Sequence, residues 1–207
     1  RAISYRQAKG FDHTKIALSV GVQQMVRSDI GGSGVMFSID TETGFPEAVL
    51  IDGSWGLGES VVQGIVTPDE YTVFKPLLDK PVQPIIKKVL GSKERKIIYA
   101  ANGDRIKQVN TSAEERATFV LSDDETLQLA HWAVAIEEHY GKPMDMEWAK
   151  DGDTGELYIV QARPETVQAR KEAGVLKTYT LKQEGKTLLT GLSIGEAIGA
   201  GKVKIIT

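Results

Sequence analysis

A β-hairpin signal in the last third of the sequence constrains the fold more than any other feature. Two strand-like stretches, residues 144–150 and 157–162, flank the turn sequence Asp-Gly-Asp-Thr-Gly at 151–155. Glycine and aspartate favour a tight reversal of the chain, and Pro164 ends the second strand because proline cannot donate to a ladder. The pattern therefore predicts a paired hairpin.

The polar face of this hairpin is the first candidate site. Because side chains alternate along a strand, Asp145 and Glu147 share one face of the first strand. Gln161 and Arg163 share one face of the second strand for the same reason. If the strands pair without a bulge, one register brings both sets to the same side, where oxygen donors suit Mg²⁺ and a guanidinium suits phosphate. A half-exposed hairpin whose polar side chains only face water is commoner for any single strand and stays open as the alternative. Apolar bulk is expected on the opposite face from Met144, Met146, Trp148, Tyr158 and Val160.

A glycine-rich passage is the second candidate site. The sequence GSWGLGES at 53–60 follows a predicted strand at 47–52 and leads into a short predicted helix at 60–63. Glycines let backbone amides approach an anion closely, and the start of a helix adds a favourable dipole. A tight strand-to-helix turn without a ligand is the alternative, and this pattern alone slightly favours it. The predicted turn at 31–34, with the loop at 40–46, is a weaker signal of the same kind.

The remaining elements follow from periodicity and from helix and turn signals. The clearest helix is 123–140, with Ser122 and Glu125 as a capping box and Gly141 as its stop. Residues 16–26 are apolar enough to predict a central strand. The other predicted elements are a helix at 1–9 and strands at 35–38, 71–75 and 85–99, the last interrupted near Gly91.

Composition excludes several classes of function. The net charge of -3 is small, and the basic residues are interspersed with acidic ones, so we expect no nucleic-acid partner. The absence of cysteine excludes disulfides and thiolate metal sites. No apolar run is long enough to span a bilayer, so a cytoplasmic protein without a membrane partner is the expectation. His13, His131 and His139 show neither metal-ligand spacing nor the context of a nucleophile.

Both ends of the chain predict a piece of a larger protein. The first residues resemble the middle of a helix, and the last six alternate like a strand with nothing after it.

Four stretches together resemble the nucleotide-binding domain that phosphoenolpyruvate synthase shares with pyruvate phosphate dikinase. They are VGVQQMV at 20–26, GVMFS at 34–38, GSWGLGESVVQGIVTPDEY at 53–71 and MDMEWAKDGDTGELYIVQARP at 144–164. The resemblance covers most of residues 1–168, and the long glycine-rich stretch is specific to this family.

The resemblance implies an α+β fold of the ATP-grasp type, in which two subdomains clamp ATP. On this basis residues 1–168 form the C-terminal part of the nucleotide-binding domain, with the first subdomain missing. Residues 169–175 are a linker, and 176–207 begin a β-rich swivelling phosphohistidine domain.

The resemblance also assigns roles to hairpin residues, with ATP and Mg²⁺ as the ligands. Glu147 and Gln161 match the family's magnesium-binding pair, and Arg163 matches an arginine that contacts phosphate.

Outside the hairpin, Glu59 matches an acidic residue at the nucleotide site. The hinge that reads adenine, largely through its backbone, corresponds to Gln24, Met25 and Val26. The loop matching the phosphate-proximal segment carries Ser33, Ser38 and Thr41.

The family reaction converts pyruvate, ATP and water into phosphoenolpyruvate, AMP and phosphate through a phosphohistidine, in gluconeogenesis. This chain lacks the histidine motif, the lysine and arginine of the first subdomain, and the barrel that binds pyruvate. We therefore expect no catalytic residue here, no turnover by the fragment and weak ATP binding. Three alternative functions stay open: a pyruvate phosphate dikinase, an antibiotic phosphotransferase of the same family, and a non-catalytic nucleotide-binding module. The full-length protein could also form a homodimer.

Overall fold

A computed structural model describes residues 2–17, 19–100, 105–165, 186 and 201. The predicted linker at 169–175 lies outside the described residues. So does the predicted start of the swivelling domain at 176–207, apart from Lys186 and Gly201.

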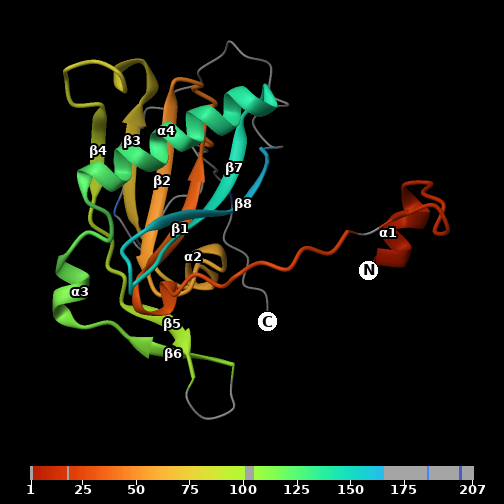
Figure 1. The fold of residues 1–207 in the computed structure, drawn as a ribbon, viewed down its shortest axis with the longest axis horizontal. Helices are drawn as coiled ribbons and strands as arrows, with labels where there is room; N and C mark the ends of the chain where they lie inside the picture. Colours follow the sequence, from red (N-terminus) through yellow and green to blue (C-terminus); the bar gives the residue numbers. More distant parts are fainter. Residues whose placement is uncertain (1, 18, 101–104, 166–185, 187–200, 202–207) are drawn as a thin grey trace.

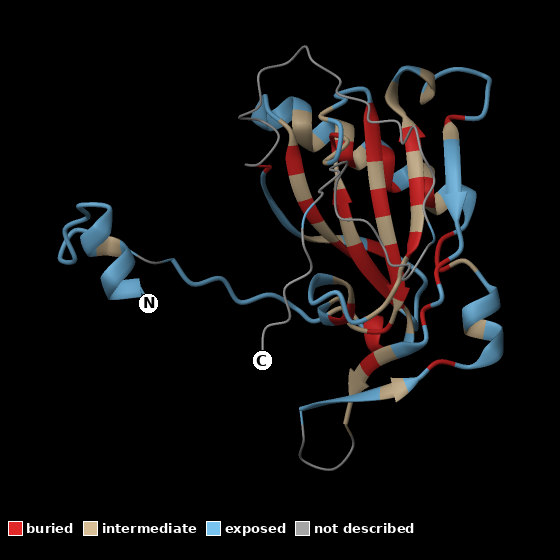
Figure 2. Ribbon diagram, turned by 180° about the vertical axis from the view of Figure 1, so that it is seen from behind, coloured by how far each residue is buried: buried red, intermediate tan, exposed pale blue. Residues whose placement is uncertain are grey.

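A six-stranded antiparallel sheet forms the body of the molecule, in the order β4-β3-β2-β1-β7-β8 (Figure 1). Its central strands carry many of the buried residues (Figure 2) and are apolar on one face, which requires a covering layer. With the helix that covers it, this gives a mixed α/β architecture. The strands are β1 (Gly32–Phe37), β2 (Ala48–Trp55), β3 (Asp69–Phe74), β4 (Ile85–Val89), β7 (Met144–Lys150) and β8 (Leu157–Pro164).

The covering layer is the helix α4 (Asp123–Tyr140), which lies across one face of the sheet (Figure 1). Its predicted bounds, its capping box and its stop at Gly141 are all confirmed; Gly141 takes the left-handed conformation with φ of 63°. Leu129 and Ala133 of the predicted apolar face are fully buried, whereas Tyr140 is exposed. The core consists of this helix face together with Met36, Val49, Ile51, Tyr71, Val73, Met144, Met146 and Trp148.

A smaller layer lies at one end of the main sheet. The antiparallel pair β5 (Arg95–Tyr99) and β6 (Ile106–Asn110) forms a separate two-stranded sheet, followed by the short helix α3 (Ala113–Ala117). The helix α2 (Glu59–Val62) follows the glycine-rich passage, as predicted. The 3-10 turns η1 (Ser28–Ile30) and η2 (Lys75–Leu77) complete the described elements.

The predicted central strand at 16–26 is wrong. The described residues of this stretch lie in no helix or strand, and Val20 and Val22 are 85% and 100% exposed. An apolar pattern shows that a segment suits a β-sheet, but a strand forms only where a neighbouring strand pairs with it. None of the described residues forms such a pair with this stretch. This segment connects the body to α1 (Ala2–Ala8), the predicted first helix, which lies apart from the body in Figure 1.

Two further predictions differ from the structure. The expected turn at 31–34 is largely strand, because β1 already begins at Gly32. Gly34 is needed there for space, since a Cβ would meet the Asp52 carbonyl and approach the Trp148 ring to 2.9 Å. The predicted strand at 85–99 is divided between two sheets, and β6 and α3 were not predicted. A capping box at Ser112 and Glu115 was the signal that marks α3.

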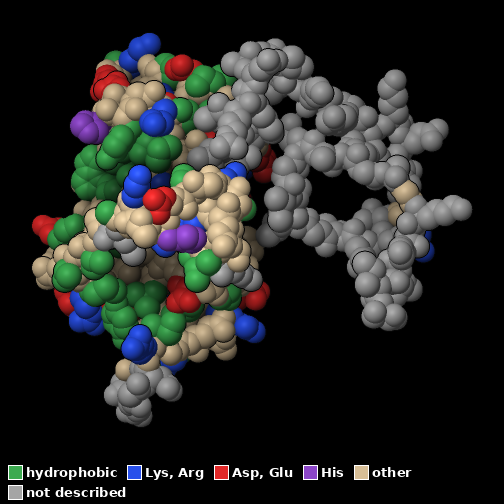
Figure 3. All heavy atoms as spheres, turned by 90° about the vertical axis from the view of Figure 1, so that its right-hand side faces the viewer, with side chains coloured by type: hydrophobic (Ala, Val, Ile, Leu, Met, Phe, Trp, Pro, Cys, Tyr) green, Lys and Arg blue, Asp and Glu red, His purple; other side chains and the backbone are tan. Residues whose placement is uncertain are grey.

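No helix within the described ranges is both long and apolar enough to cross a membrane. On the face shown in Figure 3, acidic and basic side chains are interspersed among apolar ones.

Candidate functional site

A pocket of about 510 Å³ lies on the side of the sheet opposite α4. It joins segments that are far apart in the sequence: residues 23–26, the passage 57–59, the end of β5, and the hairpin of β7 and β8. Most of its lining is apolar, and Glu59 and Glu147 supply the acidic groups. Concave apolar sites with a few converging polar groups are the usual form of small-molecule sites.

The register of the hairpin brings the predicted polar residues to one face. Glu147 lies directly opposite Gln161, and Asp145 lies directly opposite Arg163. Directly opposed residues in an antiparallel ladder share a face, so the predicted pairing is confirmed. The role of these residues stays a prediction.

A β-bulge changes the opposite face of the hairpin. The register shifts between Glu147 and Trp148, so Trp148 pairs with Ile159 and the bulge leaves Val160 on the pocket side. Ile159 therefore packs against the core, whereas Tyr158 is 39% exposed. The prediction that Tyr158 and Val160 face the core is wrong, because the extra residue reverses the alternation.

Asp145 holds Arg163 in place. The Nε and Nη2 atoms of Arg163 lie 2.8 and 2.7 Å from Oδ2 of Asp145. The Arg163 side chain remains 65% exposed. It is therefore oriented along the rim of the hairpin while still accessible to an anion.

The glycine-rich passage is held close to β5. The amide of Leu57 donates to the carbonyl of Ile97 at 2.9 Å. Gly56 has φ of 86°, and a Cβ there would lie 2.5 Å from the same carbonyl, so only glycine fits. The next turn places Glu59 at the start of α2, where its carboxylate accepts from the Gln63 side chain at 2.7 Å.

Gln24, Met25 and Val26 line the pocket as an extended segment next to β8. The Gln23 side-chain amide donates to the Val160 carbonyl at 3.4 Å, on the bulged residue. At the other end, the Arg27 amide donates to the Asp151 carboxylate at 3.0 Å. These contacts hold the segment along the hairpin and leave its middle facing the pocket.

Of the predicted site residues, Ser38, Thr41, Gln161 and Arg163 do not line the pocket, and the last two are exposed on the hairpin. Ser38 is fully buried, and its hydroxyl accepts from the Met144 amide at 2.8 Å, which joins the end of β1 to the start of β7. Thr41 lies in the loop after β1. Ser33, by contrast, is at the pocket and donates to the Gly56 carbonyl at 2.5 Å.

Tyr99 and Ile106 are pocket residues that the sequence did not reveal. Tyr99 stands at the end of a predicted strand without a motif to distinguish it, and Ile106 begins a strand that was not predicted. The Tyr99 hydroxyl is buried and has no hydrogen-bond partner within the described part of the chain. Buried hydroxyls usually form hydrogen bonds, so this hydroxyl is suited to form one with a ligand.

A row of carboxylates crosses the pocket side of the sheet. Val35 pairs with Glu147 on one side and with Asp52 on the other, and Asp52 pairs with Glu70. Burial, followed by the negative charge of Glu70, raises the pKa of Asp52 to about 6.

Comparison with known proteins identifies the family. Residues 1–183 match the AMP/ATP-binding domain of pyruvate phosphate dikinase. The chain belongs to this family. Over its full length it is 58% identical to a phosphoenolpyruvate synthase of Synechocystis, 52% to one of Aquifex aeolicus and 54% to one of Escherichia coli. It spans 26%, 25% and 26% of those relatives, about a quarter of their length.

The donor set at the hairpin fits a magnesium ion that is shared with a ligand. Among the described residues, no group of three or more His, Cys, Asp or Glu side chains could hold a metal alone. Mg²⁺ is commonly bound by one or two carboxylates, while phosphates and water supply its other ligands. The carboxylate of Glu147 opposite the amide of Gln161 has that character.

Proposed function

We propose that the chain is the ATP- and Mg²⁺-binding portion of a phosphoenolpyruvate synthase with an ATP-grasp fold. Such an enzyme converts pyruvate, ATP and water into phosphoenolpyruvate, AMP and phosphate through a phosphohistidine. The pocket is the observation that carries the proposal, because segments resembling the family's adenine and metal segments both line it. The relatives named phosphoenolpyruvate synthase, at up to 58% identity, support this member of the family.

In this proposal the adenine base lies along residues 24–26. Backbone N–H and C=O groups there would read the edge of the base. The side chains of Leu57, Val62 and Ile106, which line the same pocket, would contact its faces. The unpaired Tyr99 hydroxyl is available to the bound nucleotide. Glu59 belongs to the same end of the site.

The phosphates extend toward the hairpin in this proposal. Glu147 and Gln161 would hold Mg²⁺, which neutralises phosphate charge when bound. Arg163 would contact phosphate oxygens, oriented by its ion pair with Asp145. Ser38 and Thr41 would act through the shape of the loop after β1, since neither lines the pocket.

The other parts of the reaction belong to regions that these residues do not supply. We propose that a swivelling phosphohistidine domain begins near residue 176 and that pyruvate binds elsewhere in the full-length enzyme. The 207-residue chain would bind MgATP weakly and would not turn it over, because phosphoryl transfer needs several cations placed together.

Replacing Glu147 in the full-length enzyme tests the proposal. Glu147→Ala removes the carboxylate from the metal site, so phosphoenolpyruvate formation should be abolished while the circular dichroism spectrum is unchanged. Glu138→Ala is the matched control, because Glu138 is exposed on α4 and does not line the pocket. Normal turnover by folded Glu147→Ala enzyme would overturn the metal-site assignment.

A further inference from the structure

The β5–β6 hairpin shapes the pocket although it is not part of the main sheet. Its strands contribute Tyr99 and Ile106 to the pocket lining. The Ile97 carbonyl also holds the Leu57 amide, two residues before Glu59. The position of this hairpin therefore sets two walls of the pocket at once, its own and that of the glycine-rich passage.

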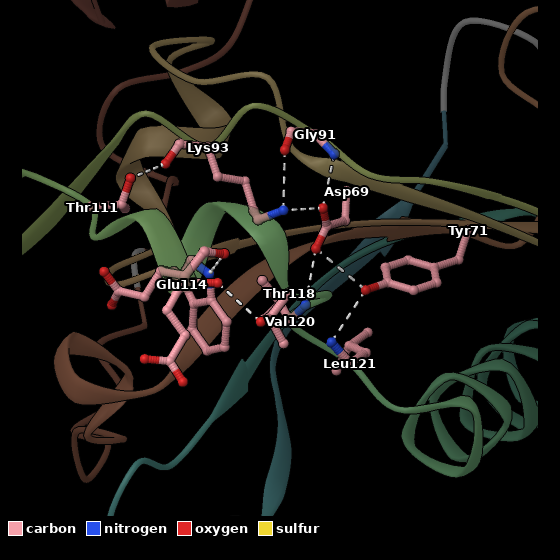
Figure 4. A network of polar contacts seen from close by, with 11 residues as sticks. Asp69, Tyr71, Gly91, Lys93, Thr111, Glu114, Thr118, Val120 and Leu121 are labelled. Atoms are coloured by element: carbon pink, nitrogen blue, oxygen red, sulfur yellow. Dashed lines mark hydrogen bonds and ion pairs between the residues drawn. The ribbon is translucent and has the colours of Figure 1, made fainter.

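A single buried carboxylate connects the base of this hairpin to the main sheet (Figure 4). One oxygen of Asp69 accepts from the Gly91 amide at 2.8 Å and from the Lys93 ammonium. The other oxygen accepts from the Val120 amide at 2.9 Å and from the Tyr71 hydroxyl at 3.5 Å. Asp69 thus joins β3, the connection before β5 and the connection before α4.

Lys93 is the residue through which this network reaches the hairpin. Its amide donates to the Thr67 carbonyl at 3.1 Å, and its carbonyl accepts from the Thr111 hydroxyl at 2.5 Å. Lys93 stands just before β5 and Thr111 just after β6, so both ends of the hairpin are tied at one point. The Thr111 amide adds a bond to the Glu94 carbonyl at 3.1 Å.

The buried ion pair of Asp69 and Lys93 costs more free energy than its contribution to stability alone would explain. The side chains of Asp69 and Lys93 are both 0% exposed, and apolar residues of similar volume often replace such a pair without loss of stability. Lys93 also has φ of 39°, the only positive φ among the described non-glycine residues. Strained backbone of this kind is maintained where the surroundings fix a required geometry.

We propose that Asp69 and Lys93 are positioning residues, which set nucleotide affinity by fixing the β5–β6 hairpin against the pocket. Neither residue lines the pocket, so both act through Ile97, Leu57 and Tyr99. The proposal rests on the proposed nucleotide binding, which it deepens.

Titration of the 207-residue chain with MgATP by calorimetry tests this inference. Lys93→Met keeps the length of the side chain and removes its charge, and it should weaken MgATP binding about tenfold, the equivalent of about 1.4 kcal/mol. Leu129→Ala is the control, because it opens a cavity under α4 and lowers stability at a residue that does not line the pocket. Its MgATP affinity should equal that of the wild type, at a temperature where circular dichroism shows each variant folded.

Thr111→Val provides a milder variant if Lys93→Met does not fold. It removes the hydroxyl bond to the Lys93 carbonyl and keeps the shape of the side chain, so MgATP affinity should fall roughly threefold, the loss expected from a single hydrogen bond. Unchanged affinity in folded Lys93→Met or in Thr111→Val overturns the inference, and so does an equal loss in Leu129→Ala. A wild-type chain that does not bind MgATP overturns the proposed function itself.

Discussion

Two acidic residues on adjacent strands show how local environment decides what a carboxylate does. Asp69 is paired with Lys93 and accepts from backbone amides, so its charge organises the connections around it. Asp52 stands on the pocket side opposite Glu70, a group of the same charge. Burial and this neighbour raise the pKa of Asp52, which means that folding disfavours its ionised form.

Asp52→Asn should therefore stabilise the chain at neutral pH. The folded-state pKa of about 6 exceeds the ordinary aspartate value of 3.8, so the folded state binds the extra proton between about pH 4 and 6. The contribution of this carboxyl to stability therefore decreases as pH rises through that window. Asparagine does not ionise, so the substitution removes this decrease. The free energy of unfolding at pH 7, measured in urea, should rise by about 1–2 kcal/mol. Asp79→Asn, at an exposed position, should leave the pH dependence unchanged. An Asp52→Asn variant with no gain in the free energy of unfolding at pH 7 would contradict this role of Asp52.

At the scale of elements, the sequence predicts those whose signals are local. The capping box and terminal glycine mark α4 to the residue, and the turn at 151–155 marks the β7–β8 hairpin. The prediction of a strand at 16–26 is wrong because strand formation depends on a partner strand from elsewhere in the fold. The bulge at Val160 is likewise invisible in the sequence, since it is a property of two strands in register.

The capping boxes of α4 and α3 allow a matched test of how strongly each helix is anchored to the core. Ser122 begins α4, which buries Leu129 and Ala133, whereas Ser112 begins α3, which buries no residue. Ser122→Ala should lower the free energy of unfolding by about 1 kcal/mol in urea denaturation. Ser112→Ala should cost less, because α3 can fray without opening the core. Equal costs for the two variants would show that α4 is not the better-anchored helix.

At the scale of the whole molecule, the site depends on the sheet bringing distant segments together. Residue chemistry pointed to Glu147 and Gln161, and the family resemblance pointed to residues 24–26 and Glu59. Only the fold shows that 24–26, Glu59 and Glu147 line one pocket, with the β5–β6 hairpin as another wall. Tyr99 and Ile106 were missed for that reason, because nothing in their neighbouring sequence specifies which residues they will face.

Nucleotide binding in this pocket can be tested by a nuclear magnetic resonance titration of the ¹⁵N-labelled chain with ATP and Mg²⁺. We expect saturable shifts of the backbone amides of residues 24–26, 57–59 and 147–149, which line the pocket. These shifts should weaken when Mg²⁺ is omitted and in Glu147→Gln, a substitution that removes the charge and keeps the shape of the side chain. Shifts that do not saturate, or that gather around α4 and the 151–155 turn instead, would contradict nucleotide binding in this pocket.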